Sequence, residues 1–198
     1  IAINTTDANE QHYEVPAGFY EIVLGPWLKY SCGYWDDNIT TLQSSEEKML
    51  ELTIERAEIK TGSEILDLGC GWGSFSLYAA NKFPDKHFTA VSNSHSQRKF
   101  IEGRARELDI KNLDVITSDV NDYNPAQQFD RVVSVEMFEH VRNYDRLFNK
   151  IKSWLVKGGK LFVHIFNHKK YAYKFEAERK SDWMARHFFT GGMMPSDE

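Results

Sequence analysis

The segment Ile65-Leu66-Asp67-Leu68-Gly69-Cys70-Gly71-Trp72-Gly73 carries an apolar run directly into a cluster of three glycines. The apolar run predicts a short buried strand over residues 64–68, and the pattern after the glycines predicts a helix over residues 74–82. Glycines at such a turn leave out the Cβ atoms that would keep a ligand away from the backbone. The start of the helix also offers free N–H groups. This strand–turn–helix unit therefore predicts a ligand site in an α/β fold.

The alternation of strand and helix repeats along the chain. Ser44 with Glu47, and Ser94 with Gln97, have the spacing of capping boxes at two helix starts. Strands that alternate with helices indicate a doubly wound, mostly parallel sheet, in which ligands bind at the carboxyl ends of the strands. Further strands are predicted at residues 87–91, 113–117, 131–135 and 160–166, and further helices at residues 45–60, 94–108 and 144–155.

Two flanking regions differ from this core. Residues 11–41 mix aromatic residues with Gly and Pro, which favours short helices and loops that lie over a neighbouring core. We expect an N-terminal helical and aromatic lid over residues 1–44 and a ligand-binding core over residues 45–168. Residues 169–198 are partly helical in pattern, and we expect them to begin a substrate-binding insertion. Because five strands leave such a sheet incomplete, we expect the protein to continue beyond this sequence.

Composition narrows the class of function. The 198 residues are 41% hydrophobic and 27% charged, as in a soluble globular protein, and their net charge is −5. An acidic chain argues against nucleic acid as a main partner, because phosphate binding needs a basic face. The apolar runs are too short to span a bilayer, and no signal peptide is recognised. Cys32 and Cys70 have no metal-site spacing and are too few for a disulfide framework, so no metal and a reduced, cytoplasmic setting are expected.

An acid beside the glycines predicts the charge of the ligand. A dinucleotide fingerprint reads G-x-G-x-x-G and has its acid about 20 residues later. Here the spacing is G-x-G-x-G, and Asp67 comes before the first glycine. A carboxylate at this place repels a pyrophosphate and favours a positively charged group, such as an amino group or a sulfonium. A tight turn without any ligand is the alternative for the glycines alone.

Four stretches in the expected order carry a resemblance to a known family. ILDLGCGWG resembles the first motif of class I S-adenosylmethionine-dependent methyltransferases, which have a Rossmann-like fold, and GCGWGS is similar to the form in the cyclopropane-fatty-acid synthase family. YSCGY at residues 30–34, VSNSHSQ at 91–97 and EMFEH at 136–140 resemble further motifs of that family. The coclaurine N-methyltransferase branch is the most similar, through EMFEHVRNY, FVHIFNHK and DWMARHFFTGGMMPS.

This resemblance implies S-adenosylmethionine as cofactor and S-adenosylhomocysteine (SAH) as its product. Asn93 and Gln97 would hold the ribose, although from the residues alone Gln97 also fits half of a capping box. Many class I enzymes have an acid where Asn93 stands, and the resembled family shares this departure. Tyr30 and Ser31 would close over the methionine end. The implied site is completed by Asp67, Gly69, Cys70, Gly71, Gly73 and Val135 around the glycine loop, and by Asp119 and Val120 beside the adenine.

Three ionisable residues follow the fourth predicted strand. If this segment turns helically, Glu136 shares a face with Glu139 and His140. The alternative is a solvated helix start, where the helix dipole favours acidic residues. The resemblance favours a catalytic cluster, in which we expect His140 to act as general base near neutral pH. Glu139 would orient His140 or share its proton, and Glu136 would anchor a cationic amine.

The sequence therefore predicts an N-methyltransferase that acts on a small amine, and an amine with an aromatic part is favoured. The alternative is methylation or cyclopropanation of unsaturated acyl chains of phospholipids, in which Cys32 and a bicarbonate ion manage a carbocation. A non-catalytic cofactor-binding protein is a third hypothesis. The resemblance leaves a homodimer open. Residues expected at the substrate are Cys32, Tyr34, His164, Trp183 and Phe188, of which Trp183 and Phe188 equally fit core packing.

Overall fold

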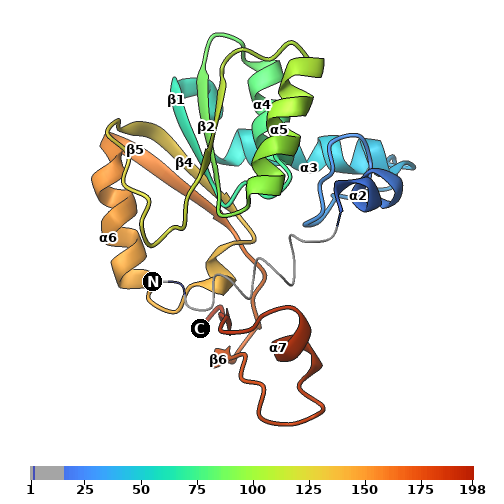
Figure 1. Cartoon of the computed structure of the whole chain (residues 1–198), viewed down its shortest axis with the longest axis vertical. Coiled ribbons are helices and arrows are strands. Elements are labelled where there is room, and N and C mark those ends of the chain that lie inside the picture. The colour runs from blue at the N-terminus through green and yellow to red at the C-terminus, as the bar shows by residue number, and fades with distance from the viewer. Residues whose placement is uncertain (1, 3–15) are drawn as a thin grey trace.

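The computed structural model describes Ala2 and residues 16–198. Its centre is a five-stranded sheet in the order β3-β2-β1-β4-β5, in which every neighbouring pair is parallel. Helices cover both faces of the sheet (Figure 1). The doubly wound α/β fold is thereby confirmed. The strands are β1 (Glu64–Leu68), β2 (His87–Ser92), β3 (Leu113–Thr117), β4 (Phe129–Val135) and β5 (Leu155–His164).

Alternate residues of the central strand β1 belong to two separate cores. On one face of the sheet, Ile65 packs with α3 (Leu42–Arg56), α4 (Ser74–Lys82) and α5 (His95–Glu107). On the other face, Leu66 and Leu68 pack with α6 (Tyr144–Trp154). Because successive side chains of a strand point to opposite faces, a strand covered on both sides is apolar along most of its length. Asp67 is a buried acid within that apolar run.

Helix α3 begins earlier than the capping-box spacing predicted. Thr41 is the N-cap, and its side chain accepts a hydrogen bond from the backbone N–H of Ser44. The prediction of Ser44 as the cap was therefore wrong, because a second hydroxyl three residues earlier takes that place. The helix ends at Arg56 rather than residue 60, since Glu58 adopts a left-handed conformation at φ 53° before a short 3₁₀ turn, Ile59–Thr61.

Helix α5 confirms half of its predicted capping box. Ser94 is the N-cap and accepts from the backbone N–H of Gln97 at 3.3 Å. The reciprocal bond is absent, because the Ser94 N–H donates to Ser92 Oγ and Gln97 Oε1 accepts from Ser92 Oγ. The Gln97 side chain is therefore held by the end of β2 and turned away from a capping role.

The remaining core elements lie where the sequence placed them, with some shifted ends. β1, α4 and β3 match their predicted bounds. The largest difference is in β5, which runs over 155–164 rather than 160–166. Gly158, at φ 84°, and Gly159 interrupt its apolar pattern, and the register with β4 shifts between Phe129 and Arg131. An irregular strand start of this kind leaves no period-two signal in the sequence.

The flanking segments contain short elements. Helix α2 (Ala17–Val23) follows residues 11–15, which lie outside the described part of the chain. After the sheet, β6 (Tyr173–Lys174) pairs antiparallel with β7 (Met193–Met194), and α7 (Trp183–His187) lies between them (Figure 1). In the residues that the structure describes, no helix has both the length and the apolar character needed to cross a bilayer.

Candidate active site

The glycine turn at the end of β1 is a site of close approach. Gly69, Gly71 and Gly73 all have positive φ, at 83°, 54° and 80°. A Cβ on Gly69 would lie 2.6 Å from Met137 Cγ, and one on Gly73 would lie 2.7 Å from Ile101 Cγ1. A Cβ on Gly71 would meet no heavy atom within 4 Å. Two of the glycines are thus needed for packing, whereas the third faces open space that a ligand can occupy.

Two cavities meet at this turn. The larger cavity has a volume of about 400 Å³, and the smaller cavity about 70 Å³. Gly69, Gly71 and His140 line both of them. The two cavities therefore form one elongated site along the carboxyl ends of the strands, where doubly wound sheets bind ligands.

The smaller cavity offers an unused hydrogen-bond donor. Gln97 is 1% exposed, and its Nε2 has no hydrogen-bond partner within the described part of the chain. Asn93, Asp119 and Val120 line the same cavity. A buried amide donor without a partner is costly unless a ligand completes it. The donor suits the hydroxyl groups of a ribose, so this part of the site fits a nucleoside.

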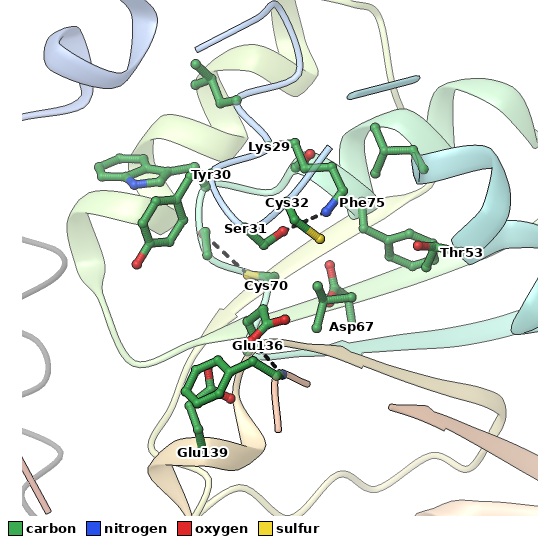
Figure 2. Close-up of a pocket in the computed structure, with 18 of the residues that line it drawn as sticks. Lys29, Tyr30, Ser31, Cys32, Thr53, Asp67, Cys70, Phe75, Glu136 and Glu139 are labelled. Atoms are coloured by element: carbon green, nitrogen blue, oxygen red, sulfur yellow. Dashed lines mark hydrogen bonds between the residues drawn. The ribbon is translucent and has the colours of Figure 1, made fainter. Parts of the chain in front are cut away.

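Asp67 projects into the larger cavity from the end of β1 (Figure 2). It accepts a hydrogen bond from Ser76 Oγ at 2.5 Å. Burial raises the pKa of Asp67 to about 6, because the charged form loses its hydration. A cation bound nearby would lower this pKa again, because it would stabilise the carboxylate.

The cluster after β4 comes together without the helix that the sequence predicted. Glu136 has a left-handed backbone at φ 50°, and only Phe138–His140 form a 3₁₀ turn. The predicted helical face does not form, because Glu136 lies in a bend after β4 and its N–H donates to the carbonyl of His164 at the end of β5. A non-glycine residue in this conformation is uncommon, and such strain is concentrated at functional sites.

Glu136 is half-buried and Glu139 is buried, and their carboxyl groups are near enough to act on each other's charge. Glu139 is 2% exposed, and its Oε2 has no hydrogen-bond partner among residues 16–198 and Ala2. Burial and the neighbouring Glu136 raise the pKa of Glu139 to about 8. Burial also raises the pKa of Glu136. Two carboxyl groups so close retain a shared proton near neutral pH.

Two further side chains reach this pair from other elements. His164, at the end of β5, has its Nε2 3.7 Å from Glu136 Oε1 and 3.7 Å from Cys32 Sγ. Burial lowers the pKa of His164, with the positive charge of Lys29 as a second cause. The His140 ring lies 5.7 Å from the Phe189 ring, centroid to centroid. Residues from the N-terminal segment, two strands and the C-terminal segment thus converge on one place.

The structure brings together most, but not all, of the predicted site residues. Tyr34, Gly73, His164 and Trp183 line neither cavity, although His164 contacts residues that do. Trp183 is 55% exposed and packs on Phe188 with 5.0 Å between ring centroids. The predicted residues that line the larger cavity are Tyr30, Ser31, Cys32, Asp67, Gly69, Cys70, Gly71, Val135, Glu136, Glu139, His140 and Phe188, and those on the smaller cavity are Gly69, Gly71, Asn93, Gln97, Asp119, Val120 and His140.

Sequence reasoning missed Lys29, Phe166 and Glu46. Lys29 and Phe166 line the larger cavity. Glu46 lies outside it but is fully buried, and its carboxylate accepts from the backbone N–H groups of Gly25, Trp27 and Lys29. Lys29 directly precedes the recognised YSC stretch, which is a usable signal. The sequence gives no such signal for Glu46, because an acidic residue in a helix of mixed polar and apolar residues is normally predicted to be exposed.

Comparison with known proteins agrees with this geometry. The family model for mycolic acid cyclopropane synthetase matches residues 2–198. An (S)-coclaurine N-methyltransferase of Thalictrum flavum subsp. glaucum is 43% identical over 194 residues, which are 98% of this chain and 54% of the relative. A cyclopropane-fatty-acyl-phospholipid synthase of Escherichia coli (strain K12) is 33% identical over 189 residues, which are 94% of this chain and 46% of that protein.

A solved structure is also similar throughout the chain. A coclaurine N-methyltransferase bound to N-methylheliamine and SAH superposes with a TM-score of 0.92 at 38% identity, covering 99% of this chain and 57% of that one. The chain thus spans about half the length of the curated relatives it matches. The resemblance seen in the glycine loop and its companion motifs is confirmed, and the chain belongs to the mycolic acid cyclopropane synthetase family, which here includes coclaurine N-methyltransferases.

Proposed function

We propose that this protein is an S-adenosylmethionine-dependent N-methyltransferase that acts on a small amine. The similarity to coclaurine N-methyltransferases supports the reaction. The observation that carries the proposal is the pair of Glu136 and the buried Glu139, which faces the same cavity as the glycine turn. A site that combines a cation-binding acid at the cofactor end with acidic groups at the acceptor end suits a sulfonium and an amine together.

The cofactor would extend through both cavities. Gln97 Nε2 would donate to the ribose, Gly71 would lie against the ligand, and Asp67 would face the positive charge of the methionine end. When bound, the sulfonium supplies a methyl group that is already electrophilic and a neutral leaving group. The protein then has to align the acceptor in line with that methyl, and orientation contributes on the order of 7–11 kcal/mol.

The acceptor end would bind and deprotonate the amine. Glu136 and Glu139, which share a proton, retain about one negative charge and would attract one ammonium group. Tyr30, Phe166 and Phe189 would give the acceptor an aromatic wall. His140 would take the amine proton to expose the lone pair, which typically accelerates a reaction by about 10²- to 10⁴-fold.

Labelled cofactor tests this proposal directly. The chain is incubated with methyl-labelled S-adenosylmethionine, a panel of small amines and phospholipid vesicles that contain unsaturated acyl chains. Label in the amines alone supports N-methylation. His140→Ala should then retain SAH affinity and lose about 10²-fold or more in turnover. Label in neither class, with SAH still bound in calorimetry, would overturn the catalytic proposal in favour of a cofactor-binding protein.

A specific cluster favours the lipid reaction as second candidate. Cys32 and His164 lie beside Glu136, and the cyclopropane synthase of Escherichia coli is also similar. The cluster fits a bicarbonate ion, because burial lowers the pKa of His164 and a neutral imidazole can donate its ring N–H to an oxyanion. Label recovered in the lipids rather than in the amines would select this candidate.

The setting of the protein is a further part of the proposal. Cys32 and Cys70 are both free thiols, which supports a reducing compartment such as the cytoplasm. A homodimer stays a prediction, and sedimentation equilibrium at micromolar concentration tests it. Fractionation of cells that express the tagged protein tests the location.

A further inference from the structure

Lys29 is a buried cation inside the larger cavity. Its side chain belongs to the segment that Glu46 fixes to α3, and Lys29 as a whole is 6% exposed. The Nζ donates to Ser31 Oγ at 2.6 Å (Figure 2). No carboxylate in the described part of the chain forms an ion pair with it. Lysines are seldom buried to this extent unless an anion pairs with them.

The acids around Lys29 already accept hydrogen bonds from other groups. Glu136, Glu46 and Asp67 are near enough to act on its charge through space. The Glu46 carboxylate, however, accepts from three backbone N–H groups. Asp67 accepts from Ser76 Oγ, and Glu136 accepts from the backbone N–H of Phe166. Burial is the largest influence on Lys29 and lowers its pKa. The ammonium group therefore has two further N–H donors and a cavity in which to use them.

Lys29 and Asp67 project into the same cavity from different elements (Figure 2). Lys29 contributes a positive charge and Asp67 a negative charge to the wall of this one cavity. An α-amino acid presents the complementary pair, a carboxylate and an ammonium on one carbon. Groups of this kind form charge-assisted hydrogen bonds, which are stronger than neutral ones.

We propose that Lys29 binds the α-carboxylate of the cofactor's methionine end, opposite Asp67, which faces the α-ammonium. This inference rests on the proposed cofactor and adds a specificity residue to it. Lys29 would make the site select cofactors that retain the carboxylate, whereas the nucleoside is selected at the other end by Gln97 and its neighbours. The anion would also complete the pairing that the buried ammonium lacks.

The competing explanation is that Lys29 only holds Ser31 in place. The two roles differ in what they predict for ligands that lack the carboxylate. A binding role makes the effect of Lys29 depend on that one group. If Lys29 only positions the segment, its replacement should weaken the binding of every ligand of the cavity to a similar degree.

Isothermal calorimetry with three ligands separates these roles. SAH carries both charges, S-(3-aminopropyl)-5′-thioadenosine lacks only the carboxylate, and 5′-methylthioadenosine lacks the whole amino-acid part. The wild type should prefer SAH over the decarboxylated ligand by about 10- to 100-fold. Lys29→Met should bind these two with nearly equal affinity, and Lys29→Arg, which keeps the charge, should retain a preference. Methylthioadenosine should bind the wild type and Lys29→Met alike, which shows that the nucleoside cavity is intact.

Lys111→Met is the matched control. Lys111 is exposed, pairs with Asp109 before β3, and lies at the end of the sheet away from the glycine turn. This variant should keep the wild-type preference. An unchanged preference in Lys29→Met, or equal weakening of all three ligands, would overturn the role of Lys29 and leave the proposed cofactor standing. A folded wild type that binds none of the three ligands would overturn the proposed cofactor as well.

Discussion

Glu139 keeps a proton at a pH where an exposed acid has lost it. Its pKa is raised by burial and by Glu136, whereas in the unfolded chain it returns toward 4.5. Between these two values the native state binds more protons than the unfolded state, so the stability that this proton gives is lost as pH rises. For one group the loss is at most about 1.4 kcal/mol per pH unit.

Glu139→Gln should therefore flatten the pH dependence of stability. An amide keeps the shape and the neutral charge of the protonated acid without its titration. Thermal unfolding followed by circular dichroism at pH 5, 6.5 and 8 should show a smaller fall in the variant than in the wild type. Glu178→Gln, at an exposed position, should behave as the wild type. Equal slopes in all three proteins would remove Glu139 as the titrating group.

Whether a site residue could be predicted depended on its local sequence context and on whether its residue type is usually buried or exposed. Asp67 was recognised because it stands just before the first glycine of the turn, where a carboxylate predicts a positively charged ligand. Lys29 and Glu46 were not, because Lys and Glu are normally solvated, and their burial follows from contacts between distant segments. The sequence carries no local pattern for a bond such as that from Gly25 N–H to Glu46.

At the level of elements, helix α3 holds the N-terminal segment in place through Glu46. Three backbone N–H groups converge on this one carboxylate, and a Cβ on Gly25 would lie 2.5 Å from Glu46 Oε2. The held segment leads directly to Lys29, Tyr30, Ser31 and Cys32, which line the larger cavity. The position of this cavity wall therefore depends on one side chain of a neighbouring helix.

Glu46→Gln should loosen this wall while the sheet stays folded. An amide loses one acceptor and adds donors that face other donors, which typically costs about 1–3 kcal/mol. Limited proteolysis should cleave the variant faster within residues 16–41, and SAH affinity should fall. Glu55→Gln, at an exposed position on the same helix, is the control. Wild-type cleavage and affinity in Glu46→Gln would show that the segment is held by other contacts.

Element boundaries were predictable where one periodic signal dominated. β1 and α4, on either side of the glycine turn, have mostly apolar patterns, and their predicted bounds were correct. The prediction for the segment after β4 was wrong because a left-handed conformation at Glu136 decides the course of the backbone. A sequence signals such a conformation only when glycine occupies the position. Such strained turns come from the surrounding packing rather than from local preference.

For the molecule as a whole, the site is assembled from both ends of the chain around one sheet. In the order β3-β2-β1-β4-β5, the chain adds β2 and β3 on one side of β1 and then β4 and β5 on the other. Both cavities lie at the carboxyl ends of the strands beside this switch point. This placement followed from the sequence, because alternating strands and helices allow few other topologies. The contacts of the flanking segments could not be predicted from the sequence, because they depend on the surface that the folded sheet and its helices present.

Ligand binding should consequently stabilise the entire fold. SAH at a hundred times its dissociation constant should add about 2.7 kcal/mol to the free energy of unfolding. For a domain of this size that corresponds to a rise in Tm of roughly 5–10 °C in differential scanning calorimetry. NAD at the same concentration should leave Tm unchanged, because Asp67 opposes a pyrophosphate. A shift with NAD and none with SAH would reverse the assignment of the site.

The wall that the two cavities have in common has a practical meaning for inhibitor design. Gly69, Gly71 and His140 border both spaces, so the two cavities adjoin at the glycine turn. A compound that joins adenosine to an aryl amine through a short thioether tether would span the two compartments as one piece. Such a conjugate incurs the entropic cost of immobilisation once rather than twice, so it should outcompete either half supplied alone.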